Sequence, residues 1–260
     1  MYNDTSKEIL SGGCLITDDY GENLYNRQRW NGEKMKIVLI NASSRKNGAT
    51  SKILNEFSNN LSSKSNVEVN LINVSDLKLE FCLGCCQCYK TGICFIKDDA
   101  EIISKLLAGA DGIIIGTPCY ASSISGQLKT LIDRGHFVIE QLLMDKHAVG
   151  VVTYENADGG SAFKALKKLF IYSGSKTVGK LLVKLPFNSD PIADEATKAS
   201  IKKQSDKLYN SIVNKKKSVT NTIIHFFVFN FGIKPFVLKK GDLYSGVLDH
   251  WKNRNIDIKQ

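Results

Sequence analysis

The apolar and polar residues of this chain follow two periods that alternate along most of its length. Short apolar runs rich in β-branched residues predict strands at residues 36–41, 67–73, 111–117, 147–153 and 178–185. Apolar residues at helical spacing predict helices at residues 50–61, 100–110, 160–173 and 196–213, with a further long helix after a loop that begins at Pro118. Strands that alternate with helices indicate an α/β fold with a doubly wound parallel sheet, and five strands favour the order 2-1-3-4-5.

This strand order brings two polar loops to one crevice. In such a sheet, ligands bind beyond the carboxyl ends of the strands, at the switch point between the first and third strands. The loops that border this crevice are residues 42–50 and 118–126. We therefore expect a small-molecule site between them.

The loop at residues 42–50 has the composition of an anion site. It leads into a helix that Thr50 or Ser51 is predicted to cap, so unpaired backbone N–H groups and the positive end of the helix dipole face it. Hydroxyls at Ser43, Ser44, Thr50 and Ser51 add neutral donors, and Arg45 can bind two phosphate oxygens at once. The segment lacks the G-x-x-x-x-G-K-[ST] and G-x-G-x-x-G patterns, which disfavours nucleoside triphosphates and dinucleotides. On residue types alone, an ordinary solvated connection is the alternative.

The run NASSRKNGATSKIL, residues 41–54, resembles the phosphate loop of flavodoxin-like FMN reductases, whose pattern is close to G-S-P-R-K-N-G-N-T. Ala42 takes the place of the first Gly, Ser44 that of the Pro, and Ala49 that of the last Asn, which removes one side-chain donor. The resemblance implies a flavodoxin-like fold and an FMN phosphate bound by Ser43, Arg45, Asn47, Ala49, Thr50 and Ser51.

The loop that begins at Pro118 can serve the ring of a flavin. An isoalloxazine needs backbone N–H groups near its pyrimidine edge and an apolar or aromatic surface against its face. The segment Pro118, Cys119, Tyr120, Ala121 and Ser122 can supply both, although a plain strand-end loop before a core helix is the alternative.

Resemblance favours the flavin. The pattern G-x-P-x-Y, followed by small residues and LK-x-x-x-DR, is similar to the flavin-ring loop of the NADPH-dependent FMN reductase and iron–sulfur flavoprotein family. The run TYENADGG resembles a third loop of that family and implies contacts from Thr153 and Gly160. The match extends from about Met35 to Asn188.

Five of the seven cysteines lie between Cys82 and Cys94. Four of them have the spacing C-x2-C-x2-C-x5-C, whose first three members recur every third residue as in compact ferredoxin runs, whereas zinc sites mostly use two separated pairs. Iron–sulfur flavoproteins show the same spacing, which implies a 4Fe–4S cluster. Cluster-free thiols and zinc are the alternatives, and Cys86 is not expected to be a ligand. The predicted ligands are Cys82, Cys85, Cys88 and Cys94.

Composition bears on the compartment and the partners. Residues 1–34 are polar and lack the apolar core of a signal peptide, so we interpret them as an N-terminal extension of a domain at residues 35–213. Clustered cysteines suit a reducing compartment, and the cytoplasm is the expected location. The net charge of +9 lies entirely in residues 196–260, but no nucleic-acid reading motif accompanies it, so we expect no nucleic-acid partner.

Residues 214–260 form a basic and aromatic C-terminal extension. Its run TIIHFFVFNFGIKPFVL is dense in Phe, but Asn230, Gly232, Lys234 and Pro235 interrupt it, so we expect no transmembrane segment. Three uses compete: packing on a partner subunit or on its own domain, a lid over the flavin, and a membrane-surface anchor aided by the lysines. The ending DHWKNRN resembles the tail of longer family members, which favours packing.

Taken together, the resemblance implies a homo-oligomeric FMN oxidoreductase, a dimer or tetramer, that takes electrons from NAD(P)H or ferredoxin. The acceptor would be a flavin, a quinone or another small molecule. No side chain is predicted to be catalytic, because the flavin supplies the chemistry, and the four scattered His residues are expected to be structural. The alternatives are a cluster-free NAD(P)H:FMN or quinone reductase and a non-catalytic electron carrier or thiol redox sensor.

Overall fold

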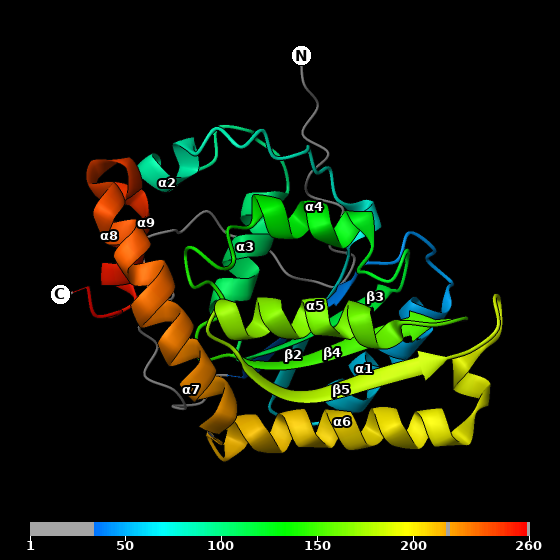
Figure 1. Ribbon diagram of the computed structural model, residues 1–260. Helices are drawn as coiled ribbons and strands as arrows, with labels where there is room; N and C mark the ends of the chain where they lie inside the picture. Colours follow the sequence, from blue (N-terminus) through cyan, green and yellow to red (C-terminus); the bar gives the residue numbers. More distant parts are fainter. Residues whose placement is uncertain (1–33, 217–218, 259–260) are drawn as a thin grey trace.

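A five-stranded parallel sheet forms the centre of the molecule (Figure 1). The computed structural model describes residues 34–216 and 219–258, so all but the last residue of the predicted N-terminal extension lies outside the described residues. The strand order β2-β1-β3-β4-β5 confirms the predicted order. The strands are β1 (Met35–Asn41), β2 (Val67–Asn73), β3 (Gly112–Pro118), β4 (His147–Tyr154) and β5 (Lys176–Lys184).

Helices cover both faces of this sheet because successive residues of a strand point to opposite sides. Ile37 and Leu39 of β1 pack with α1 (Ala49–Ser62) and α6 (Glu195–Val213) on one face. Val38 and Ile40 pack on the other face with α3 (Ala100–Gly109), α4 (Gly126–Arg134) and α5 (Gly159–Tyr172). The apolar side chains of the central strands are therefore buried on both faces of the sheet, as in other parallel sheets.

Two helix boundaries differ from the sequence-based expectation. The predicted capping of α1 by Thr50 or Ser51 is wrong. The N-cap is Gly48, which has no side chain to cap the helix, and Thr50 and Ser51 lie inside the first turn. The predicted long helix after Pro118 is also shorter than expected, since α4 ends at Arg134. The chain turns there because His136 has a positive φ of 49°, a conformation that no helix interior accepts.

The segment between β2 and α3 carries the cysteines and has little regular structure. It begins with a 3₁₀ turn, η1 (Val74–Asp76), and contains one short helix, α2 (Gln87–Thr91). A second 3₁₀ turn, η2 (Pro191–Ala193), links β5 to α6.

The C-terminal extension is helical and packs on its own domain (Figure 1). It consists of α7 (Val219–Val228), a π-helical turn η3 (Phe229–Ile233), α8 (Lys234–Lys240), a 3₁₀ turn η4 (Gly241–Tyr244) and α9 (Ser245–Asn253). Trp251 is fully buried and donates from Nε1 to the Ile139 carbonyl at 3.1 Å. By length and composition alone, the helical run Thr220–Asn253 would suffice to cross a bilayer.

Candidate functional site

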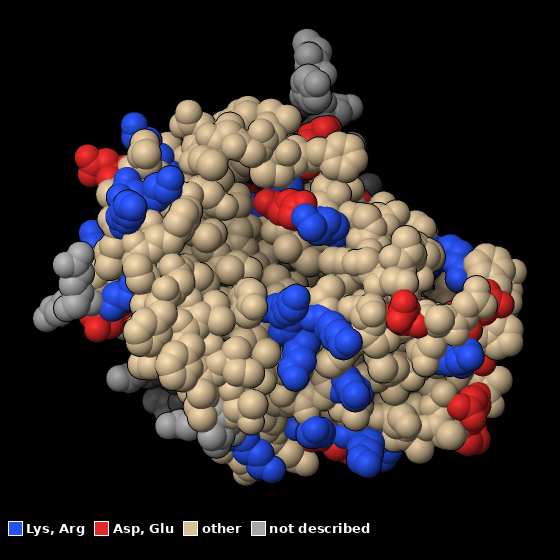
Figure 2. All heavy atoms as spheres, in the orientation of Figure 1, with Lys and Arg blue, Asp and Glu red and all other residues tan. Residues whose placement is uncertain are grey.

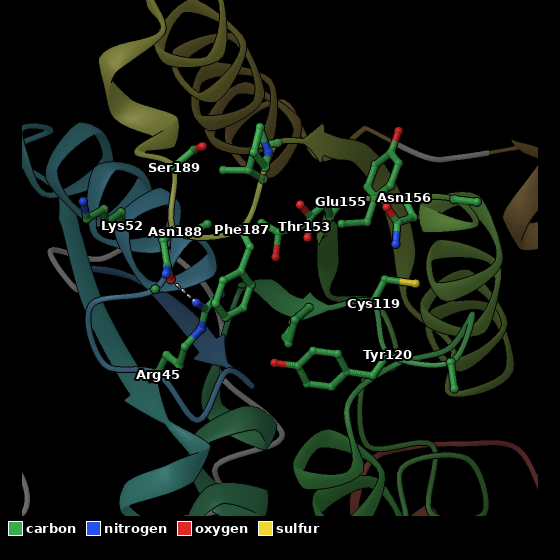
Figure 3. Close-up of a pocket in the computed structure, with 18 of the residues that line it drawn as sticks. Arg45, Lys52, Cys119, Tyr120, Thr153, Glu155, Asn156, Phe187, Asn188 and Ser189 are labelled. Carbon is green, nitrogen blue, oxygen red and sulfur yellow. Dashed lines mark hydrogen bonds between the residues drawn. The ribbon is translucent and has the colours of Figure 1, made fainter.

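A cavity of about 480 Å³ opens at the carboxyl ends of the strands (Figure 3). Four connections meet around it: β1 to α1, β3 to α4, β4 to α5, and β5 to α6. The first two are the loops expected to border the crevice. The cavity therefore lies where the topology of a doubly wound sheet predicts a ligand.

The β1–α1 loop is held in shape by its own side chains. Asn41 donates to the Ser51 hydroxyl at 2.7 Å, and Ser51 donates to the Arg45 carbonyl at 2.8 Å. The Ser43 hydroxyl accepts from the Arg45 N–H at 3.2 Å. Because the N-cap Gly48 has no side chain to cap α1, the first N–H groups of that helix keep their capacity to bind an anion.

Arg45 reaches across the mouth of the cavity to the β5–α6 loop (Figure 3). Its Nη1 donates to Asn188 Oδ1 at 2.9 Å, and its guanidinium lies 4.4 Å from the centre of the Phe187 ring. Its Nε is buried and has no hydrogen-bond partner within the described part of the chain. A buried N–H donor without a partner is costly, so the site is suited to an acceptor such as a phosphate oxygen.

The β3–α4 loop forms a tight turn beside the cavity. Tyr120 and Ser123 exchange backbone hydrogen bonds of 3.0 and 2.9 Å, while the two residues between them, Ala121 and Ser122, both have positive φ. Positive φ at both central positions is the geometry of a type I′ turn. The half-exposed Tyr120 ring extends toward Arg45 and Phe187 from the other side of the cavity (Figure 3).

Hydrogen bonds join this turn to its neighbouring loops. Ser125 donates to the Ala42 carbonyl at 2.8 Å and so fixes the turn to the β1–α1 loop. Ser122 donates to Asp158 at 2.9 Å, and the Cys119 N–H donates to the Thr153 carbonyl at 2.8 Å. Burial and the carboxylate of Asp158 raise the pKa of the Cys119 thiol, which keeps it protonated at neutral pH.

The predicted flavin residues fall into two groups. The cavity is lined by Arg45, Asn47, Ala49, Pro118, Cys119, Tyr120, Ala121, Ser122 and Thr153. Ser43, Thr50 and Ser51 are buried behind it; the Thr50 hydroxyl bonds that of Thr153 at 2.8 Å. Gly160 is exposed in the first turn of α5 and does not line the cavity.

Sequence reasoning missed the fourth wall of the cavity. Residues 185–189 line it, as does Lys52, whose ammonium lies 2.8 Å from Asp190. The signal was present: PFNSD follows the fifth strand at the same carboxyl edge, and its Pro, Asn and Asp favour a turn.

A buried ion pair holds together the two ends of the segment that carries the cysteines. Arg134 of α4 pairs with Asp98 in a contact where both side chains are almost fully buried. Arg134 also donates to the carbonyls of Glu80 and Ile96, on either side of the cysteines. Burial opposes ionisation of Asp98, but hydrogen bonds from Arg134 and from two backbone N–H groups hold its pKa below the usual value.

A second set of polar contacts joins the cysteine segment to the tail. Cys88 Sγ lies 3.1 Å from His136 Nε2, and His136 Nδ1 lies 3.3 Å from the buried Glu140. His250 of α9 contacts the other oxygen of Glu140 at 3.1 Å. Burial raises the pKa of Cys88 to about 12, so this thiol is protonated at neutral pH.

The four predicted metal ligands do not form a ligand cage. Cys82 and Cys85 are exposed, Cys88 is buried against His136, and Cys94 lies 3.6 Å from Arg134. Within residues 34–216 and 219–258, no three His, Cys, Asp or Glu side chains are placed to hold a metal ion. Thiolate chemistry suits an iron–sulfur cluster, but the positions of these four side chains do not fit one.

Comparison with known proteins fits this arrangement. A model of the NADPH-dependent FMN reductase family matches residues 35–189, more than half of the chain. The chain belongs to this family. An iron–sulfur flavoprotein of Clostridioides difficile (strain 630) is 37% identical over 225 residues, which cover 85% of this chain and all of that protein. An iron–sulfur flavoprotein of Methanocaldococcus jannaschii is 35% identical over 151 residues, covering 56% of this chain and 75% of its own.

Solved structures share the fold of this FMN reductase family member. An NADH:FMN oxidoreductase in its apo form (EMOB) superposes with a TM-score of 0.54 at 20% identity, over 68% of this chain and 90% of its own. An azoreductase of Bacillus anthracis gives 0.53 at 15% identity, over 68% and 99%. The predicted flavodoxin-like fold is confirmed, and in general terms the protein is a flavin-dependent oxidoreductase.

Proposed function

We propose that this family member uses FMN to pass electrons from NAD(P)H or ferredoxin to a flavin, a quinone or another small acceptor. The observation that carries the proposal is the cavity at the carboxyl edge of the sheet. At its β1–α1 end lie the N-terminus of α1, whose N-cap is a glycine, and the Nε of Arg45, which has no hydrogen-bond partner among the described residues; both suit a phosphate. The type I′ turn at Tyr120 and Ser123 lies at the other end, where a ring would bind.

In this proposal, each loop has a separate part in binding. Arg45 and the N–H groups near Asn47 and Ala49 hold the phosphate, while Ser43, Thr50 and Ser51 position that loop from behind. Pro118, Cys119, Tyr120, Ala121, Ser122 and Thr153 surround the ring. A contact from Gly160 stays a prediction, because Gly160 is exposed and does not line the cavity. Bound FMN would supply hydride acceptance and single-electron release. The chain contributes binding, orientation and shielding from water, so none of its side chains is assigned a catalytic role.

An iron–sulfur cluster is a separate hypothesis, favoured by the cysteine spacing and by the names of the relatives. Cys82, Cys85, Cys88 and Cys94 would have to gather from the separate positions they occupy. We therefore assign no electron step to a cluster. If the thiols carry no metal, the protein is a plain flavin or quinone reductase, or a thiol redox sensor.

The remaining parts of the proposal concern the cell. We expect a homo-oligomer located in the cytoplasm, where reduced thiols persist. Ferredoxin as a donor and a small molecule as the acceptor are parts of the same proposal.

The test is an absorption spectrum with iron and acid-labile sulfide assays on protein purified without oxygen, followed by NAD(P)H oxidation kinetics. Flavin bands and turnover with NADH or NADPH would support the reductase. Flavin that only reduced ferredoxin can reduce would support an electron-transfer role instead. About four irons per chain would establish a cluster, and a protein that binds no FMN would refute the proposal.

A further inference from the structure

The tail presents an apolar face that no described residue covers. Seven large apolar side chains point outward from α7 to η4, with relative exposures from 38% for Ile224 to 72% for Phe231. These residues, which we call the tail face, are Ile223, Ile224, Phe226, Phe227, Phe231, Phe236 and Leu243. Within it, the rings of Phe226, Phe227 and Phe231 contact one another, with centroids 5.7 to 6.5 Å apart. Exposed apolar side chains that cluster in this way mark an interaction site.

The opposite side of the same helices is fixed to the domain. Phe229, Val237 and Trp251 are buried in a separate apolar cluster, and His225 Nδ1 lies 2.8 Å from the Ile171 carbonyl at the end of α5. Arg254 donates to the carbonyls of Glu140 and Leu142. A helix that crossed a bilayer would have to give up all of these contacts. The tail is therefore built to lie along a surface and not to pass through it.

Positive charge borders the tail face. Lys215 and Lys216 precede α7, Lys239 and Lys240 end α8, and all four are exposed. Asp242, next to Leu243, is the one acidic residue between Val219 and Leu243. Figure 2 shows a broad uncharged surface over α7 with basic side chains gathered beside it, over α5. The exposed lysines of α5, which packs against α7, are Lys164, Lys167 and Lys168.

We propose that the tail face binds the surface of a bilayer that contains anionic phospholipid, with α7 and α8 lying in its plane. An apolar stripe with lysines along its border is the pattern of an interfacial helix: the Phe rings enter the acyl boundary and the ammonium groups meet anionic headgroups. A second copy of the chain fits less well, because a two-fold contact would place one lysine border against the other.

The orientation leaves the cofactor site free. In Figure 1 the tail lies at one side of the molecule, and the carboxyl ends of the strands point to the other. A protein held by its tail face therefore keeps the cavity open to water. Substitutions in the tail face should accordingly leave FMN content and NAD(P)H turnover unchanged.

Flotation of the full-length protein with vesicles tests the proposal. We expect binding to equal parts phosphatidylcholine and phosphatidylglycerol, and none to pure phosphatidylcholine. Phe227→Glu/Phe231→Glu should weaken binding by about tenfold or more, since each ring would lose its burial in lipid. Lys239→Glu/Lys240→Glu should weaken it by about fivefold per lysine or more, and high salt should weaken wild-type binding.

Two control variants distinguish an effect of the tail face from a general effect of removing an exposed apolar side chain or a surface lysine. Ile102→Glu alters an exposed apolar residue of α3, and Lys203→Glu alters an exposed lysine of α6; both should bind vesicles like the wild type. Unchanged FMN content would show that each variant is folded.

Three outcomes would overturn the proposal. The first is failure of the wild type to float with either vesicle. The second is equal binding to neutral and anionic lipid. The third is a wild-type oligomer that ignores lipid and whose light-scattering mass falls in Phe227→Glu/Phe231→Glu, which would assign the tail face to a second copy of the chain.

Discussion

Replacement of Arg45 by Ala should weaken FMN binding through loss of the phosphate contact alone. The guanidinium already has one donor paired with Asn188 and is placed over the Phe187 ring, but its buried Nε has no partner among the described residues. A hydrogen bond to a charged group contributes about 1.5–3 kcal/mol. Loss of the contact should therefore raise the Kd for FMN by about 10- to 150-fold.

Riboflavin provides the decisive comparison because it has the same ring and no phosphate. Flavin-fluorescence titration of apoprotein should show that Arg45→Ala weakens FMN binding and leaves riboflavin binding unchanged within about twofold. Arg45→Lys keeps the charge but loses the planar pair of donors, so it should fall between the wild type and Arg45→Ala. Lys46→Ala is the matched control, since Lys46 is the next cation along the chain but pairs with Asp76 at 2.9 Å and does not line the cavity.

Two results would refute this assignment. If Arg45→Ala weakened riboflavin binding as much as FMN binding, the residue would shape the cavity as a whole and not bind a phosphate. If FMN binding were unchanged, the phosphate would have to bind elsewhere. Because Arg45 is partly exposed, the variant should fold, and thermal unfolding of the apoprotein should verify that.

Further predictions concern the buried charges. Arg134→Met should lower the free energy of unfolding by about 3–5 kcal/mol, because it leaves Asp98 buried without its cation. In urea titrations, the double variant Arg134→Met/Asp98→Asn should lose less stability than the sum of the two single losses. Additive losses would contradict the pairing. The pKa of His250 is raised by its hydrogen bond to Glu140, so its stabilising effect is full below about pH 6.5 and is lost as the pH rises through the folded pKa. His250→Gln should therefore lower stability more at about pH 5.5 than at about pH 9, and an equal loss at both would be evidence against this ion pair.

The sheet was predictable from sequence because burial on both faces leaves an unambiguous apolar run in each strand. The order of the strands then followed from topology, and with it the meeting of the loops at Arg45 and Tyr120. Helix ends were less predictable. A hydroxyl at Thr50 suits a cap by residue type, but its actual partner is Thr153, which lies 103 residues further along the chain.

The contacts of Arg45 with the fourth wall of the cavity and the packing of the tail depend on long-range contacts that sequence spacing does not indicate. In the sequence, Phe187 and Asn188 look like ordinary turn residues. Only the fold shows that Arg45 contacts both of them across the cavity. His136 and His250 were expected to be structural, yet no pattern in the chain indicates that Glu140 joins them. Such contacts become visible only when the tail is placed against the domain.

The contacts between α2 and the tail bear on the cysteine hypothesis. Tyr89 stacks on Tyr244 at 4.8 Å, Ser245 donates to the Lys90 carbonyl, and a Cβ on Gly246 would lie 2.2 Å from the Gly92 nitrogen. The helix that carries Cys88 is thus packed against α9 without spare room. Cys82 and Cys85, by contrast, lie on an exposed loop without regular structure. If four thiols gather around a metal, Cys82 and Cys85 would therefore have to approach Cys88, whose helix is held in place by the tail.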